Sequence, residues 1–320
     1  MQCASPCSMA LSSKESRFAI TVQLRTGQKI SVMFKKNLPV LAALVLIASS
    51  CTIKEQRLEC LTPVSVHVND FRVTIDTFSD TKATDVASYT NLKALTLAFY
   101  SGETEVYKST QFQGDEAFGN FSLNLPLGTY TMVVLGYSCY EDDVLTLTSP
   151  TSAAFTAGRV GETFAYTQEV TVSNTDELEL SATLDRIVAM LKVISNDNRP
   201  AGAQKVRMTF SAGGKAFNPT TGLATSNTGF SNTVNISTAV GERSGSISYL
   251  FLDSIEQTIN VTVDVLDGNN EVLYHKVMRN VPFKRNRTTK LTGKLYTATA
   301  SGSTTFQVND DWLTDTVIPF

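Results

Sequence analysis

Apolar and polar residues alternate one by one along most of the chain, which is the spacing of β-strands. The alternation is clearest in two runs rich in valine and isoleucine, at residues 64–68 and 259–265. Turn-forming residues, such as Asp267-Gly268-Asn269-Asn270, separate many of these runs. Many short strands with turns between them predict an all-β chain that folds as two β-sandwiches. Further alternating runs lie at residues 121–125, 164–172, 206–210 and 247–251.

Interruptions of this pattern predict where the chain bends or changes sandwich. After Asn69-Asp70 the alternation resumes one residue out of step, which indicates a bulge or a turn. The polar stretch 173–177 marks the predicted junction between an N-terminal sandwich at residues 61–177 and a C-terminal one at 178–320. Residues 211–232 predict an extended loop or hairpin. A single short helix fits at either Thr84–Lys93 or Asp176–Ala182.

The one long apolar run precedes a cysteine. A short basic stretch and the apolar residues 38–47 lead to Ala48-Ser49-Ser50-Cys51. This order describes an export signal, and the apolar part is shorter than the roughly 20 residues that span a bilayer. The sequence therefore predicts a lipoprotein signal peptide at 33–50, a lipidated Cys51, with palmitate among its acyl chains, and a tether at 51–60. The alternative is a buried helix that happens to end at a cysteine.

Residues 1–32 do not fit an export signal, because they are polar and mixed and lack a hydrophobic core. Signal peptides start at the N-terminus of the translated chain. We therefore expect translation to begin at Met33, and we expect residues 1–32 to be an extension that is either disordered or irrelevant to the fold.

Composition argues against several functions. Without the six basic and one acidic residue of the first 50, the chain keeps 21 basic and 29 acidic residues, a net charge near −8. A nucleic-acid partner would require a basic face. His67 and His275 are the only histidines, and each fits an ordinary strand position. The chain contains no phosphate loop, zinc motif or nucleophile elbow. We expect no enzyme activity, no cofactor and no metal.

The cysteine count agrees with export. Cys3 and Cys7 lie in the N-terminal extension, and Cys51 would carry the lipid. Cys60 and Cys139 remain, an even number in an oxidising compartment, so a disulfide bond between them is predicted. The alternative is two separate buried thiols.

Four segments resemble the fimbrillin superfamily of Bacteroides-type bacteria, and in particular its FimB-type anchor branch. The first contains the Pro-x-Gly-x-Tyr entry to a strand, and the second resembles the strand that opens the family's second domain. The third is the most specific, and the fourth contains a late Asp-Trp pair. In chain order the segments are Leu125–Val134, Leu184–Leu191, Asn280–Gly293 and Val308–Trp312.

The resemblance implies two tandem transthyretin-like β-sandwich domains in a lipoprotein of the outer membrane, exposed at the surface as part of a fimbrium and acting in cell adhesion. Its implied partners are other fimbrial subunits, joined by strand addition, and the outer membrane through the lipid. In stalk subunits of the family a protease cuts after an arginine and removes the first strand, whereas anchor subunits skip this cut. Arg57 and Arg72 are the candidate cleavage positions here, and we expect the anchor role.

Several alternatives stay open at this stage. The apolar C-terminus, with Thr316, Val317, Ile318 and Phe320, is a candidate donor strand, but it could equally pack on its own domain. Residues 63–75 are a second candidate edge or donor segment. The chain could also be a cleaved stalk or tip fimbrillin, or a surface lipoprotein that binds glycans. The basic run Lys284, Arg285, Arg287 and Lys290 fits a solvated strand entry better than an anion site.

Overall fold

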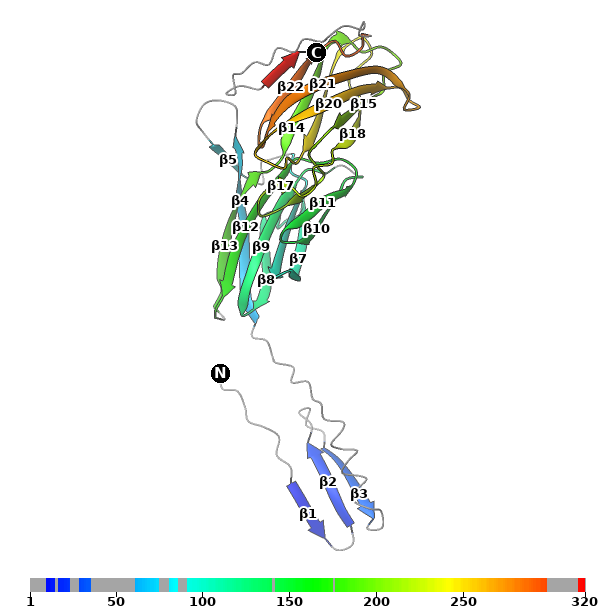
Figure 1. The fold of residues 1–320 in the computed structure, drawn as a ribbon. Helices are drawn as coiled ribbons and strands as arrows, with labels where there is room; N and C mark the ends of the chain where they lie inside the picture. The colour runs from blue at the N-terminus through cyan, green and yellow to red at the C-terminus, as the bar shows by residue number, and fades with distance from the viewer. Residues whose placement is uncertain are drawn as a thin grey trace. The chain divides into compact units, whose positions relative to one another are not determined.

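The described part of the chain is all-β (Figure 1). A computed structural model provides the coordinates, and no helix occurs in the residues that it describes. Those residues are 10–14, 17–23, 29–35, 61–74, 81–85, 91–139, 142–174, 176–297 and 316–319. They belong to two compact units, Met1–Glu59 and Cys60–Phe320.

The N-terminal unit contains one antiparallel sheet of three strands in the order β1-β2-β3. The expectation that residues 1–32 lack order is therefore wrong for these strands. Their sequences alternate apolar and polar residues, as in Phe18-Ala19-Ile20-Thr21-Val22, and this is enough to favour strands. Whether translation begins at Met33 is a separate point and stays a prediction. The strands are β1 (Ala10–Lys14), β2 (Arg17–Gln23) and β3 (Lys29–Lys35).

The first half of the second unit is an eight-stranded sheet that curls over a single core. Seven strands follow the order β5-β4-β13-β12-β9-β6-β7, and β8 also pairs with β4. Val64, Val66, Phe99, Met132 and Phe164 are among the buried residues that the sheet encloses. The strands are β4 (Leu61–Thr74), β5 (Thr81–Asp85), β6 (Ala94–Ser101), β7 (Thr104–Phe112), β8 (Asn120–Pro126), β9 (Gly128–Tyr137), β12 (Thr163–Val172) and β13 (Leu178–Arg186).

The second half is a sandwich of two four-stranded sheets. One sheet has the order β19-β14-β22-β23 and the other β18-β15-β20-β21. Leu191, Val206, Val263 and Phe283 belong to the buried cluster between them. The strands are β14 (Ala189–Asn198), β15 (Lys205–Phe210), β18 (Phe230–Asn235), β19 (Arg243–Leu250), β20 (Glu256–Leu266), β21 (Val272–Lys284), β22 (Thr288–Gly293) and β23 (Thr316–Pro319).

A third, small sheet joins the two halves. It combines β10 (Val144–Ser149) and β11 (Ser152–Ala157) with β16 (Ala216–Asn218) and β17 (Leu223–Ala224). The predicted loop or hairpin at 211–232 supplies β16 and β17. Beneath this sheet the rings of Phe155 and Phe217 both stack on Phe251, and all three belong to one buried cluster with residues of both halves. The halves therefore share a core.

The chain changes from the first half to the second between β13 and β14, later than the expected junction at 177/178. Residues 173–177 connect β12 to β13, two strands that pair in the first sheet. Polar residues mark a turn but cannot indicate which sheet the next strand joins. The short helix suggested at Asp176–Ala182 is also wrong, because Leu178, Leu180 and Ala182 point one way at strand spacing.

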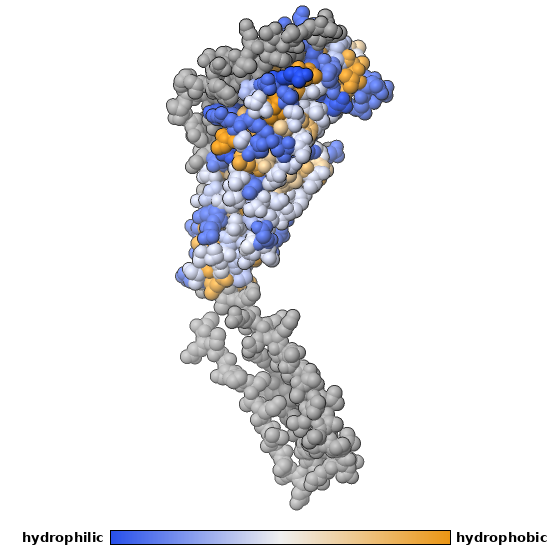
Figure 2. All heavy atoms as spheres, in the orientation of Figure 1, coloured by the Kyte–Doolittle hydropathy of each residue, from blue (hydrophilic) through white to orange (hydrophobic). Residues whose placement is uncertain are grey.

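The surface of the described part has few large hydrophobic areas on the face that is shown (Figure 2), as expected when the apolar side chains are buried. On the face shown in Figure 2, the described residues are mostly hydrophilic or neutral, and the hydrophobic ones form small separate patches. The large aromatic and aliphatic side chains are instead buried in the three clusters. Burial of these side chains is the main force that holds the sheets together.

Candidate functional site

The predicted tether leads directly into an inner strand of the first sheet. Cys51, Arg57 and Cys60 lie outside the described residues, and the description resumes at Leu61, the first residue of β4. β4 pairs in parallel with β13 along one edge. Along its other edge it pairs antiparallel with β8 and then with β5. The backbone of β4 is thus hydrogen-bonded on both sides along most of its length.

At the position where the alternation shifts in the sequence, one edge of β4 skips a residue in its pairing with β13, and the other edge changes partner from β8 to β5. The register with β13 skips Asn69, since Ala182 pairs with Val68 and Thr183 with Asp70. The pairing with β8 ends at His67, and that with β5 begins at Asp70. The predicted bulge is therefore confirmed. Because of the bulge, the single long strand β4 can pair first with β8 and then with β5, in different registers.

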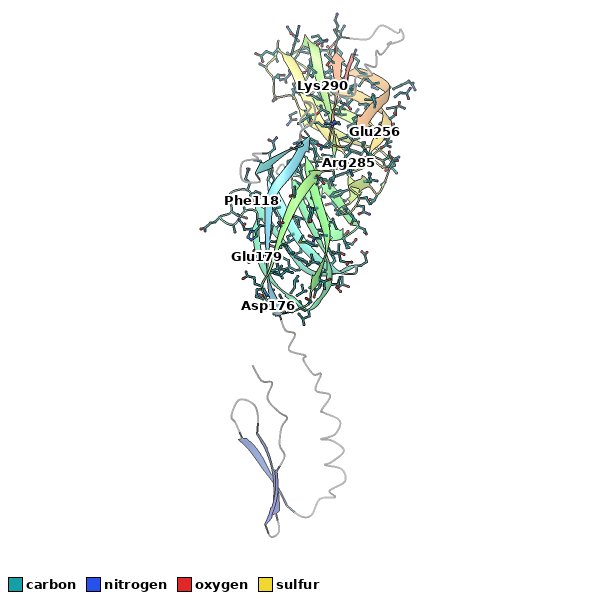
Figure 3. The ribbon with its side chains drawn as sticks, turned by 90° about the vertical axis from the view of Figure 1, so that its left-hand side faces the viewer. Phe118, Asp176, Glu179, Glu256, Arg285 and Lys290 are labelled. Carbon is teal, nitrogen blue, oxygen red and sulfur yellow. The ribbon has the colours of Figure 1, made fainter. Side chains whose placement is uncertain are left out.

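Side chains also fix the start of β4. The Thr62 hydroxyl donates to the carbonyl oxygen of Asn174 at 2.6 Å, and the Ser65 hydroxyl donates to Glu177 Oε1 at 3.3 Å. Both acceptors lie in or beside the connection between β12 and β13. Figure 3 shows Asp176 and Glu179 at this end of the first half. The start of β4 therefore lies beside the acidic connection between β12 and β13.

The predicted disulfide between Cys60 and Cys139 does not form, and Cys139 is a half-buried free thiol. The register explains why. Leu61, the neighbour of Cys60, pairs with Pro126 near the start of β9, whereas Cys139 follows the end of β9. β9 is ten residues long, so its two ends lie roughly 30 Å apart. A disulfide requires Cα atoms within about 7 Å of each other. Counting cysteines could not reveal this separation.

Of the two candidate cleavage positions, only Arg72 lies in the described part. Its backbone pairs with Ala83 of β5 and with Asp185 of β13. A protease binds its substrate as an extended, accessible segment, so cleavage after Arg72 would require β4 to leave both neighbours first.

The C-terminal segment pairs with its own chain. Residues Thr316, Val317, Ile318 and Pro319 form β23, a parallel edge strand beside Thr289–Thr292 of β22. Phe320 lies outside the described residues. Of the two alternatives, packing on its own domain is the one that the structure contains. The segment 63–75 falls mostly within β4 and is likewise paired rather than an edge.

The basic run near residue 287 does not form one cluster. Lys284 makes an ion pair with Glu256, and Arg285 donates from Nη1 to the Thr221 carbonyl oxygen at 2.8 Å. Asn286 takes a left-handed conformation, with φ of 59°, at the turn between β21 and β22. Arg287 follows this turn, and Lys290 lies within β22. Figure 3 shows Arg285 near the level where the halves meet and Lys290 farther along the second half.

A polar hollow of about 360 Å³ lies where the two halves meet. Its floor contains an ion pair between Arg186 and Glu162, with 2.5 Å between Nη2 and Oε1 and exposed side-chain fractions of 16% and 5%. Arg186 also donates from Nη1 to Asn286 Oδ1 at 3.1 Å, and its guanidinium lies over the Phe164 ring. Asn91 lies at the rim and, with Glu162 and Arg186, comes from the first half.

The rest of this hollow, which we call the junction hollow, comes from the second half. Its further lining residues are Val188, Met190, Lys192, Ile247, Tyr249, Asn286, Arg287 and Thr288. Of the charged residues in this lining, only Arg287 was a candidate in the sequence, as part of the basic run. Several of the others lie in the segments Leu184–Leu191 and Asn280–Gly293, which resemble the fimbrillin superfamily, but only pairing of the strands brings the lining together.

The two histidines occupy strand positions, as expected. His67 Nδ1 lies 2.8 Å from Asn120 Oδ1 on the neighbouring strand β8. His275 is 60% exposed, and its Nδ1 lies 2.6 Å from Oδ1 of the buried Asp264. Arg207 donates to the other oxygen of Asp264, from Nε at 3.1 Å and from Nη2 at 2.7 Å. Arg207, Asp264 and His275 are cross-strand partners in one row of the sheet.

Within the described ranges, no three His, Cys, Asp or Glu side chains are grouped so that they could hold a metal ion. In the same part of the chain, no helix has the length and apolar character needed to cross a membrane.

The chain belongs to a family of unknown function, DUF6562, whose model matches residues 70–317. No curated protein matches it in sequence. Among solved structures it is similar to a candidate adhesin from Bacteroides ovatus, with a TM-score of 0.47 and 10% identity over 68% of this chain and 82% of that one.

Two other solved structures are similar over the same share of this chain. One is the fimbrial anchor protein Mfa2 from Porphyromonas gingivalis, with a TM-score of 0.41 and 12% identity over 68% of this chain and 82% of that one. The other is a candidate polysaccharide-binding protein from Bacteroides thetaiotaomicron, with a TM-score of 0.42 and 10% identity over 68% of this chain and 80% of that one.

Proposed function

We propose that this chain is a fimbrial subunit of the anchoring kind, attached to the bacterial outer membrane through a lipid on Cys51 and joined to other fimbrial subunits by its body. The observation that carries the proposal is the position of β4, the strand that follows the predicted tether. It is an inner strand with hydrogen-bonded neighbours on both edges. The role is structural and requires no catalysis or cofactor.

An inner strand suits a protein that carries load. A pull on the lipid tether would act at Leu61, along the axis of β4. The backbone hydrogen bonds to β13 and β8 lie across this axis, so they would share the load and break together. A strand pulled from its end at right angles would instead lose its bonds one after another. The geometry therefore favours a tether that stays attached under tension.

The same position favours the anchor role over the cleaved stalk role. Removal of β4 would withdraw Val64, Val66 and Val68, all buried, from the core of the first half. Burial of a valine side chain stabilises by about 1.5–3 kcal/mol, so three of them contribute roughly 5–9 kcal/mol. The loss would also expose the backbone edges of β13 and β8. An anchor subunit keeps this strand and avoids both losses.

Contacts with other subunits are proposed to form by strand addition at sheet edges. The outer edge of β7 is one such place, because β7 pairs only with β6 among the described strands. An added strand would satisfy the free backbone groups there. The four-residue strand β23 offers a second, shorter edge in the other half.

The decisive experiment replaces the predicted lipid-bearing cysteine in the native bacterium. Cys51→Ala is expected to abolish incorporation of an alkyne-labelled palmitate into the protein and to release fimbriae into the medium. Cys60→Ala is the matched control, since it removes a cysteine from the same tether without touching the lipid site. It should label and retain fimbriae like the natural chain.

Two outcomes would overturn the proposal. One is a labelled, membrane-bound chain that never copurifies with fimbriae, which would leave a lipoprotein without a fimbrial role. The other is mature protein in fimbriae whose N-terminus begins after Arg57 or Arg72, which would make it a stalk subunit. N-terminal sequencing of the copurified chain separates these cases, and the anchor role requires an acylated Cys51 as its first residue.

A further inference from the structure

The junction hollow combines three features: a fixed polar floor, an apolar wall and an excess of cationic side chains. The floor is the ion pair of Glu162 and Arg186, which is almost fully buried. Glu162 engages one side of the guanidinium, while Asn286 and the Phe164 ring hold it elsewhere. This arrangement is set before any ligand arrives, so binding would not need to order it.

The wall is part of the outward face of the sheet β19-β14-β22-β23. Leu191 and Val193 of β14 point into the core, so the alternate residues Met190 and Lys192 point outward. In register, Tyr249 of β19 lies beside Met190, and Ile247 lies beside Lys192. Ile247 is 39% exposed. The wall therefore offers an aromatic and aliphatic surface with an ammonium group in its middle.

The charges in the hollow favour an anion. Arg186, Lys192 and Arg287 line it together with a single carboxylate, that of Glu162, and Glu162 is already paired with Arg186. Among the described residues, the Lys192 ammonium makes no hydrogen bond or ion pair. A like charge lies next to it, since Lys192 and Lys290 are register partners. An incoming carboxylate would relieve this repulsion.

We propose that the junction hollow binds a carboxylate-bearing sugar, such as a uronic or sialic acid residue of a glycan. The carboxylate would meet Lys192 and Arg287, and the sugar ring would lie against Met190, Ile247 and Tyr249. The side chains of Asn91 and Thr288 are positioned for the hydroxyl groups. The volume of about 360 Å³ lies at the small end of the ~300–1,000 Å³ range of small-molecule sites, which suits one or two sugar rings.

This inference does not rest on the fimbrial role, because it concerns the purified chain alone. The full chain, extracted from membranes in non-ionic detergent, is titrated calorimetrically with glucuronic acid and with N-acetylneuraminic acid. Glucose and acetate are the comparison probes, since each carries only one half of the proposed ligand. At least one acidic sugar should bind more tightly than both. Equal binding of glucose, or no binding of either acid at millimolar concentration, overturns the proposal.

The position of the site is tested with matched lysine variants. Lys192→Gln removes the ammonium in the wall of the hollow and should weaken binding of the acidic sugar by about tenfold or more. Lys290→Gln removes the neighbouring ammonium, which is a register partner of Lys192 but does not line the hollow, and should weaken binding clearly less than Lys192→Gln does. An equal loss in both variants would indicate general attraction to a basic surface and would refute a defined site.

A second matched pair uses the turn between β21 and β22. Arg287→Gln should weaken binding, whereas Arg285→Gln should not, because Arg285 contacts Thr221 instead. Far-UV circular dichroism and the thermal midpoint of each variant show that it is folded. If acetate and peptides ending in a free carboxylate bind as tightly as the sugars, the hollow recognises a carboxylate alone, and the sugar part of the proposal is wrong.

Discussion

Asp197, near the end of β14, is expected to be one of the most sensitive surface positions of the second half. Each of its two carboxylate oxygens accepts two hydrogen bonds. Oδ1 accepts from the Ser195 hydroxyl at 2.6 Å and from the Leu295 amide at 2.8 Å. Oδ2 accepts from the Tyr296 amide and the Thr297 hydroxyl, both at 2.9 Å. One carboxylate thus holds the segment that follows β22 against β14.

The expected cost of Asp197→Asn follows from this geometry. An amide has nearly the same shape as a carboxylate, but it places an NH₂ group where one oxygen was. Either the Leu295 or the Tyr296 amide would then face another donor. A buried donor left without an acceptor costs about 1–3 kcal/mol, and this site is only partly buried. We expect a loss of about 2 kcal/mol for Asp197→Asn, close to the loss for Asp197→Ala.

The loss should also depend on pH. Burial by itself raises the pKa of Asp197, but the hydrogen bonds from Ser195, Thr297 and the two backbone amides outweigh it and hold the pKa below its ordinary value. A carboxyl whose pKa is depressed by folding stabilises the protein above its unfolded pKa, which is about 3.9 for aspartate. This stabilisation is lost as the pH falls through the folded pKa. The difference between the natural chain and Asp197→Asn should therefore shrink on acidification.

The assay is urea unfolding followed by far-UV circular dichroism at pH 7 and at several values down to pH 3. Asp185→Asn is the matched control, because Asp185 is exposed in a strand, and it should change the free energy of unfolding by less than about 0.5 kcal/mol. If Asp197→Asn unfolds at the same urea concentration as the natural chain at pH 7, the carboxylate does not hold this segment. A loss that is independent of pH would also contradict the reasoning.

Three further predictions concern the first half. Tyr130→Phe removes the hydrogen bond from the Tyr130 hydroxyl to the Pro126 carbonyl oxygen, 2.9 Å long, and should cost about 1 kcal/mol in urea unfolding; an unchanged midpoint would contradict this. Gly161→Ala would place a Cβ 1.9 Å from the Ser138 carbonyl oxygen, so we expect a loss of about 3 kcal/mol or failure to fold, measured by thermal melting. Burial raises the pKa of the Cys139 thiol, so it should react with iodoacetamide at pH 7.5 more slowly than free cysteine does. The protein should also migrate at the same position on gels run with and without reductant, as expected for a free thiol. A shift on reduction would contradict it.

Much of the fold could be predicted from the sequence because strands leave a local signal. The period of two identified β4, β8, β12, β15, β19 and β20, although it missed β7 and left β13 as a possible helix. The shift after Asn69 located the bulge in β4. The turn at 267–270 was equally clear, since Asp267 Oδ1 accepts from the amides of Asn269 and Glu271 and closes the hairpin of β20 and β21. Each of these features depends on residues close together in the chain.

Features that depend on strand order could not be predicted in this way. The residues 173–177 have the composition of a domain boundary, yet β13 returns to the first sheet and pairs in parallel with β4. The disulfide failed for a related reason, since Cys60 and Cys139 were paired by number and compartment alone. The residues next to the two cysteines do not indicate that Leu61 pairs with Pro126, just before β9 begins, whereas Cys139 follows the end of β9.

The junction hollow illustrates the same limit for a site. Glu162 precedes β12, Arg186 ends β13 and Lys192 lies within β14. Only Arg186 falls in one of the segments with a family resemblance, Leu184–Leu191, and nothing in that segment marks it as a site residue. A charged residue next to a predicted strand is usually solvated, so sequence alone gives no reason to select these three. What distinguishes Glu162 and Arg186 is that folding removes both largely from water, at a cost that their mutual contact, the Asn286 hydrogen bond and the Phe164 ring help to offset. Their contact fixes the geometry of the floor of a hollow that both halves line. The first place to look for a ligand is therefore the junction of the halves, where buried charge and a shared core coincide.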